Sequence, residues 1–121
     1  MKRLENKIVV VTGASTGIGQ GSAKVLANEG AHVLALDISD KLDDTVKEIN
    51  EAGGQATAYK VDISDEHQVE QFAEKAKDKY GRIDVIFNNA GVDHGAGRIH
   101  EYPVEVFDKI MAVDMRGTFL V

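Results

Sequence analysis

A glycine-rich turn directly after a short apolar run constrains this chain more than any other feature. Residues 12–19 read Thr-Gly-Ala-Ser-Thr-Gly-Ile-Gly and follow an Ile-Val-Val-Val run at 8–11, which is typical of a buried parallel strand. Apolar residues then recur at helical spacing within 23–27, up to Gly30, a residue that often ends a helix. Free N–H groups and the positive end of the helix dipole meet at such a junction, so the sequence predicts an anion-binding turn.

A carboxylate follows the next apolar run. Residues 32–36, His-Val-Leu-Ala-Leu, end in Asp37, which is 18 positions after Gly19. In a dinucleotide-binding fold, an acid at the tip of the second strand holds the ribose hydroxyls of adenosine. The spacing Gly-x-x-x-Gly-x-Gly differs from the common Gly-x-Gly-x-x-Gly, and alone it also fits a purely structural turn. Strand, glycine turn, helix, strand and acid together predict a dinucleotide site.

Apolar strands and amphipathic helices alternate along the rest of the chain. We expect helices over residues 41–52 and 65–80, and strands over 56–61 and 84–87. Such alternation predicts an α/β fold of the Rossmann type, a doubly wound parallel sheet with helices on both faces. The four strands present are expected in the order 3-2-1-4, with the remainder of such a fold missing.

Composition limits the class of protein. The chain has 121 residues, enough for one modest domain, and it has no cysteine, which excludes disulfides and zinc–thiolate sites. A formal net charge of −6 without a basic patch argues against nucleic-acid binding. The apolar run after the basic start at residues 1–3 is too short for a signal peptide or a membrane span, so we expect a cytoplasmic protein without membrane contact.

Polar residues also follow the third and fourth strands. Asp62 comes after the third strand and Asn-Asn-Ala-Gly, residues 88–91, after the fourth, at the edge where open α/β sheets bind ligands. Taken singly, Asp62 also fits a helix cap or a turn, and the asparagines fit local backbone hydrogen bonding. Together with residues 12–19 and Asp37, these motifs closely resemble those of the short-chain dehydrogenase/reductase family, and the resemblance covers the entire chain.

The resemblance implies an oxidoreductase that transfers a hydride between nicotinamide and a small-molecule alcohol or carbonyl substrate. In the family, the glycine turn binds the NAD(P) pyrophosphate, the position of Asp62 contacts adenine, and the Asn-Asn-Ala-Gly tip lines the ribose on the nicotinamide side. Carried over residue by residue, with the acid of the second strand, the expected cofactor-binding residues are Gly13, Ser15, Thr16, Gly17, Ile18, Gly19, Asp37, Ile38, Asp62, Ile63, Asn89, Ala90, Gly91 and Val113.

Asp37 favours NAD over NADP as the cofactor. A 2′-phosphate would meet the Asp37 carboxylate at hydrogen-bond range, with no cation to offset the two like charges. NADP-binding members of the family resemble one another in placing a basic residue just before the second glycine or just after the second strand. This chain has Thr16 and Ile38-Ser39 at those places. NAD is therefore expected, with NADP as the less favoured alternative.

The proton-transfer residues of the family are not in the chain. In the family, a Ser and then a Tyr-x-x-x-Lys lie some tens of residues beyond the Asn-Asn-Ala-Gly motif. Tyr80 and Tyr102 do not replace them, because Asp84 and Val106 stand four positions later and a lowered tyrosine pKa needs a nearby cation. We expect residues 1–121 to be the N-terminal NAD-binding part of one dehydrogenase domain, truncated in a helix and inactive alone.

Two further positions have open roles. Asp114 stands where the family usually has Asn, which holds a water connected to the active-site lysine. As the one catalytic candidate in the chain, Asp114 either pairs with that lysine or is an ordinary helix residue. His94 lies in a glycine-rich loop at 92–101 that, by resemblance, borders the substrate cavity, and it is the expected substrate contact. Histidines in such a loop do not provide a fixed ligand set, so no metal is expected.

Other functions remain as alternatives. A catalytically inert dinucleotide-binding or interaction module is the second hypothesis. A methyltransferase of related fold shares a glycine turn and an acid after the second strand, but it does not account for residues 12–19 together with 88–91. A P-loop NTPase is excluded because no Gly-Lys-Ser/Thr follows the glycine turn. The substrate and the reaction direction stay open, and the resemblance implies a homo-oligomer, a dimer or tetramer, for the full-length protein.

Overall fold

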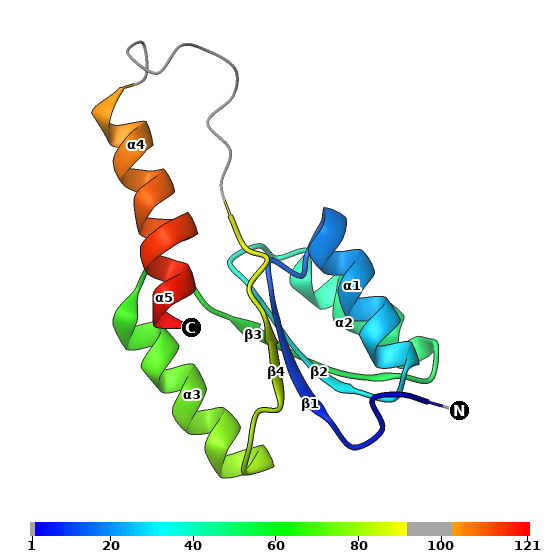
Figure 1. The fold of residues 1–121 in the computed structure, drawn as a ribbon. Helices are drawn as coiled ribbons and strands as arrows, with labels where there is room; N and C mark the ends of the chain where they lie inside the picture. The colour runs from blue at the N-terminus through cyan, green and yellow to red at the C-terminus, as the bar shows by residue number, and fades with distance from the viewer. Residues whose placement is uncertain (1, 92–102) are drawn as a thin grey trace.

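Four parallel strands form one sheet in the order β3-β2-β1-β4 (Figure 1). The computed structural model describes residues 2–91 and 103–121. The strands are β1 (Ile8–Thr12), β2 (His32–Asp37), β3 (Gln55–Lys60) and β4 (Val85–Phe87). The expected strand order and the Rossmann-like α/β architecture are therefore confirmed.

Helices cover both faces of this sheet, as Figure 1 shows. The helices α1 (Gly17–Asn28) and α2 (Leu42–Glu51) lie on one face, and α3 (Glu66–Tyr80) lies on the other. A C-terminal helical run stands beside α3. It consists of α4 (Val104–Ile110), the π-helical segment η2 (Met111–Gly117) and α5 (Thr118–Leu120). Among the described residues, none of these helices combines the length and apolar composition needed to cross a membrane.

The core has two layers, one on each face of the sheet. Val11 and Ala35 belong to the cluster under α1 and α2, whereas Val10 and Leu34 belong to the cluster under α3. Successive strand residues point to opposite faces, and both faces are covered. This burial explains why β1 is apolar at nearly every position instead of alternating with polar residues. The sheet is thus a rigid support for the residues at its carboxyl edge.

A small polar cluster lies at the opposite, amino-terminal edge of the sheet. Nε2 of His32 is 3.1 Å from Oγ1 of Thr57 and 3.4 Å from the hydroxyl oxygen of Tyr80. The His32 and Tyr80 rings also meet edge to face, with their centroids 4.9 Å apart. Burial, and secondarily the charge of Lys79, lowers the pKa of His32 from its ordinary 6.5. The folded protein therefore favours neutral His32.

We predict that His32 makes the protein less stable in mild acid. Below about pH 6.5 the unfolded chain takes up a proton on His32 that the folded protein resists, so this part of the stability is lost as the pH falls toward the lowered pKa. Urea unfolding at pH 7.5 and pH 5.5 should show a smaller pH-dependent loss for His32→Gln than for the unmodified chain. His67→Gln, on the exposed side of α3, controls for removal of one histidine. An equal loss in His32→Gln and the unmodified chain would contradict the prediction.

Candidate functional site

A hollow of about 380 Å³ opens at the carboxyl ends of the strands. Its lining comes from the tips of all four strands and from α4 and η2. The lining residues are Gly13, Thr16, Leu36, Asp37, Ile38, Val61, Asp62, Ile63, Ser64, Asn89, Ala90, Gly91, Lys109, Ala112 and Val113. Most of the residues expected to bind a cofactor are in this set. The exceptions are Ser15, Gly17, Ile18 and Gly19, which belong to the glycine turn beside the hollow.

The glycines of the turn have different physical roles. A Cβ on Gly13 would lie 2.9 Å from the Cα of Ala90, and a Cβ on Gly19 would overlap the carbonyl oxygen of Gly13. These two glycines are therefore required by the packing of the protein itself. At Gly17, φ is +57° and a Cβ would meet nothing within 4 Å. Gly17 is thus the position where the missing side chain leaves open space at the start of α1.

The amino terminus of α1 is not capped by a side chain of the helix. Thr16 is the N-cap residue, but its side chain makes no capping hydrogen bond, and the first turn contains no acidic residue. The hydroxyl oxygen of Ser15 is buried without a hydrogen-bond partner, alone in this respect among the buried side chains of the described residues. Buried polar atoms are usually paired, so Ser15 marks a place where an external group fits. The uncapped helix end favours that group being an anion.

A hydrogen-bonded clasp joins the tip of β4 to the glycine turn. The side-chain amide of Asn89 donates to the carbonyl oxygens of Thr12 at 3.2 Å and Gly13 at 3.3 Å. In return, Oγ1 of the buried Thr12 accepts hydrogen bonds from the backbone N–H groups of Asn89 and Ala90, both at 3.0 Å. The sequence did not predict this role of the Thr12 hydroxyl, because Thr12 stood out only as the first residue of the turn motif. Its hydroxyl connects two of the motifs that line the hollow.

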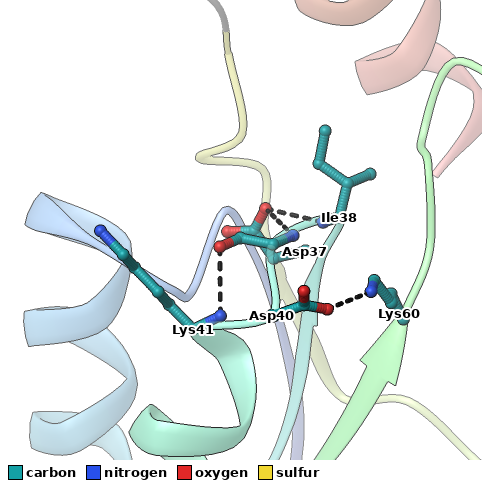
Figure 2. Close-up of polar contacts among 6 residues, drawn as sticks. Asp37, Ile38, Asp40, Lys41 and Lys60 are labelled. Atoms are coloured by element: carbon teal, nitrogen blue, oxygen red, sulfur yellow. Dashed lines mark hydrogen bonds and ion pairs between the residues drawn. The ribbon is translucent and has the colours of Figure 1, made fainter.

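Backbone N–H groups hold the carboxylate of Asp37 at the end of β2. Oδ2 accepts from the N–H of Ser15 at 3.1 Å. Oδ1 accepts from the N–H of Ile38 at 2.7 Å (Figure 2) and from the N–H of Ser39 at 3.4 Å. An ionised carboxylate has about four acceptor positions, so capacity remains for a ligand hydroxyl. Because Ser15 belongs to the glycine turn, this hydrogen bond also fixes the carboxylate relative to the start of α1.

Strand pairing brings a lysine beside this carboxylate. Lys60, the last residue of β3, is the register partner of Asp37 in the parallel sheet, and its ammonium group pairs with Asp40 in the loop after β2 (Figure 2). In the sequence Lys60 stands two positions before Asp62, but its place beside Asp37 depends on the register of the sheet. The parallel strand order was the only signal that pointed to this neighbourhood.

Residues 7–121 match the family model described as short chain dehydrogenase. This chain belongs to the short-chain dehydrogenase family. It is 57% identical to an uncharacterized oxidoreductase, YxbG, of Bacillus subtilis strain 168 over 121 residues, which is 99% of this chain and 44% of that relative. The chain thus spans about half the length of the relatives it matches.

Solved structures of family members superpose closely on the fold. An NAD⁺-bound xylitol dehydrogenase matches with a TM-score of 0.94 and 30% identity, over 99% of this chain and 46% of that one. A metagenomic short-chain oxidoreductase in complex with NADP matches with a TM-score of 0.91 and 36% identity, over 97% of this chain and 53% of that one. These neighbours bind nicotinamide cofactors of both kinds, so the comparisons leave the choice between NAD and NADP open.

Asp62 has structural partners as well as a place in the hollow. Its Oδ1 accepts from the N–H of Ser64 at 2.9 Å and from the Ser64 hydroxyl at 2.6 Å. Its own N–H donates to Oε1 of Gln68, at 2.9 Å, in the first turns of α3. The turn interpretation of Asp62 therefore holds, and Asp62 also lines the hollow. The role in adenine contact stays a prediction.

Asp114 lies in η2, whose π-helical geometry the sequence analysis did not foresee. The Asp114 carboxylate faces the backbone of Gly91, where an added Cβ would lie 3.2 Å from Oδ1, and its carbonyl oxygen accepts from the Thr118 hydroxyl at 2.9 Å. Arg116 anchors η2 to the loop before α3 through a 2.8 Å hydrogen bond to the carbonyl oxygen of Ser64. π-Helical segments inside α-helices are frequent at functional sites.

The structure does not test the expected substrate contact of His94, because His94 lies outside the described residues. Within residues 2–91 and 103–121, no group of three or more His, Asp or Glu side chains is arranged to hold a metal ion.

We predict that the clasp depends on the hydroxyl of Thr12. Thr12→Val keeps the shape of the side chain but leaves the N–H groups of Asn89 and Ala90 without their acceptor, so the free energy of unfolding should fall by about 1–3 kcal/mol. Thr12→Ser keeps the hydroxyl and serves as the matched control, with a smaller loss from one missing methyl group. Urea denaturation followed by circular dichroism gives both values. A larger loss in the Ser variant than in the Val variant would rule out the clasp as the source of stability.

Proposed function

We infer that this chain is the NAD-binding part of an oxidoreductase that transfers a hydride between nicotinamide and an alcohol or carbonyl carbon. One observation carries the inference most directly. The Asp37 carboxylate is held by backbone N–H groups at the rim of a hollow whose neighbouring turn presents an uncapped helix terminus. An acceptor for hydroxyls and a site for phosphate thus lie side by side, as a dinucleotide requires.

The residues present fit a dinucleotide at both kinds of contact. The open face of Gly17, the unpartnered hydroxyl of Ser15 and the uncapped start of α1 suit a pyrophosphate. Asp62, Ile63 and the segment from Asn89 to Gly91 supply the remaining walls, with Val113 from η2. The cofactor, when bound, supplies the hydride-carrying nicotinamide ring. The contribution of this chain is to bind and orient that cofactor.

The charge of Asp37 supports NAD as the preferred cofactor. A 2′-phosphate carries about −1.5 to −2 charges at neutral pH. Two unit charges 4 Å apart repel by about 1 kcal/mol in water and by about 4 kcal/mol near a protein surface, so a 2′-phosphate next to Asp37 is strongly disfavoured. A 2′-hydroxyl instead donates a hydrogen bond to the same carboxylate.

We also make proposals about the whole protein to which this site belongs. The chain covers 44% of the Bacillus relative, and residues 1–121 contain no Tyr-x-x-x-Lys. We therefore place the acid–base residues of the reaction outside residues 1–121, within the same dehydrogenase domain. By the same family likeness, we propose a cytoplasmic homo-oligomer, a dimer or tetramer, with a small-molecule alcohol or carbonyl substrate and no nucleic-acid partner.

We predict that Asp37 sets the cofactor preference. Asp37→Asn keeps the size of the side chain and one acceptor oxygen but removes the charge, so the ratio of NADP affinity to NAD affinity should rise by at least about fivefold. Calorimetric titration of each variant with both cofactors measures this ratio. Asp78→Asn, an exposed position on α3, makes the same charge change away from the hollow and should leave the ratio unchanged. Tighter binding of NADP than of NAD by the unmodified chain would refute the role of Asp37.

We also predict that residues 1–121 alone have no dehydrogenase activity. A positioned acid–base group contributes about 10²–10⁴-fold to such reactions, and the chain has no tyrosine with a lysine four positions later. The purified chain, offered NAD and a panel of alcohols, should show no increase in the absorbance of reduced nicotinamide. Turnover by a monodisperse preparation would overturn this view. A protein extended beyond residue 121 that carries the Ser and Tyr-x-x-x-Lys, and still lacks turnover, would favour the inert binding module.

A further inference from the structure

We propose that Asp40 is a specificity-determining residue, which neutralises Lys60 and thereby withholds from a 2′-phosphate the cation that strand register places beside Asp37. This inference rests on the proposed binding of NAD at Asp37 and adds a second determinant to it. Asp37 repels a 2′-phosphate, and Asp40 forms an ion pair with the lysine that would otherwise attract one.

Lys60 stands beside Asp37 on the same face of the sheet. The two residues are register partners in the parallel pair of β2 and β3. Two positions earlier, the partners Ala35 and Ala58 both pack in the cluster under α1 and α2, so side-chain alternation places Asp37 and Lys60 on that face as well. Adjacent strands are about 4.7–4.9 Å apart, and a lysine side chain easily spans that gap.

Asp40 occupies the ammonium group of Lys60. The Lys60 Nζ atom hydrogen-bonds Oδ1 of Asp40 in the loop between β2 and α2 (Figure 2). This hydrogen bond and the charge attraction raise the pKa of Lys60 and lower that of Asp40, so both groups are charged at neutral pH. Both side chains are largely exposed, at 61% and 93% of their surface. Exposed ion pairs are weak, so Lys60 is held in position but is not locked there.

Two acids and one lysine lie together at the tips of β2 and β3. Asp37 lines the hollow, and the Asp40–Lys60 pair lies beside it at the tips of β2 and β3. Lys109, the cation that lines the hollow, comes from α4. Lys41 follows directly in the loop, but its side chain points away from the Asp40–Lys60 pair, and its N–H donates to the Ser39 hydroxyl at 3.1 Å (Figure 2). Removing the charge of Asp40 would leave Asp43 as the weaker acidic influence on Lys60, and the Lys60 ammonium group would then be available to a phosphate beside Asp37.

The test compares Asp40→Asn with the unmodified chain by nuclear magnetic resonance titration. The probes are 5′-AMP and adenosine 2′,5′-bisphosphate, the adenosine halves of NAD and NADP, which differ only in the 2′-phosphate. We expect Asp40→Asn to increase affinity for the bisphosphate about two- to fivefold, the range of an exposed charge pair, with affinity for 5′-AMP unchanged. The gain should shrink at high salt, because exposed charges are screened.

Two further variants assign the effect to Lys60. In the double variant Asp40→Asn/Lys60→Gln the gain should disappear, because no released cation remains. Glu48→Gln removes the acid of a similar exposed ion pair, Lys24–Glu48, between α1 and α2. This matched control makes the same change in net charge near the other end of the helices, and it should not alter the affinity for either probe.

The outcomes separate this inference from the proposed function. A gain that survives Lys60→Gln, an equal gain for both probes, or an equal gain in Glu48→Gln would overturn the role of Asp40 while leaving NAD binding at Asp37 intact. If Asp37→Asn binds both probes as the unmodified chain does, the proposed site itself is wrong. Failure of the unmodified chain to bind either probe, with its fold confirmed in the same spectra, would reject both.

Discussion

The close approach of the β4 tip to the glycine turn is the contact on which the rest of the site depends. It is possible because Gly13 and Gly19 have no Cβ at the point of approach, which lets the Asn89 amide reach two turn carbonyl oxygens. The Ser15–Asp37 hydrogen bond continues this connection to the tip of β2. Three strand tips are thereby tied into one edge, and the hollow between them keeps its shape through the protein's own hydrogen bonds.

The two sides of this edge have opposite electrostatic character. The start of α1 presents a positive dipole end without an acidic residue in its first turn, whereas the tip of β2 presents the carboxylate of Asp37. The adenosine 5′-phosphate half of a dinucleotide, with its phosphate on one side of the ribose and the 2′- and 3′-hydroxyls on the other, matches this polarity in only one orientation. Under the proposed function, the orientation of that half of the cofactor depends on the backbone N–H groups of the turn as well as on the side chain of Asp37.

Local signals in the sequence predicted the strands and helices, and their alternation predicted the Rossmann-like fold with its strand order. Most of the residues expected to bind a cofactor line the hollow, because they follow directly after strands whose carboxyl ends share one edge, whereas their binding roles stay predictions. Lys60 was missed because its proximity to Asp37 depends on strand register. The π-helical geometry of η2 was missed because apolar spacing does not reveal the hydrogen-bond pattern of a helix; there, Gly117 packs so closely on Ile63 that a Cβ would be 2.8 Å from Cγ1.

The π-helical segment also sets the shape of one wall of the hollow. A π-helix closes i→i+5 hydrogen bonds where an α-helix closes i→i+4 bonds, so η2 holds about one more residue per turn than the α-helices on either side of it. Within this widened segment Val113 lines the hollow, and Gly117 packs on Ile63, which is another lining residue. The shape of that wall therefore depends on the hydrogen-bond pattern of one short helical segment, whereas the opposite walls depend on the register of the sheet.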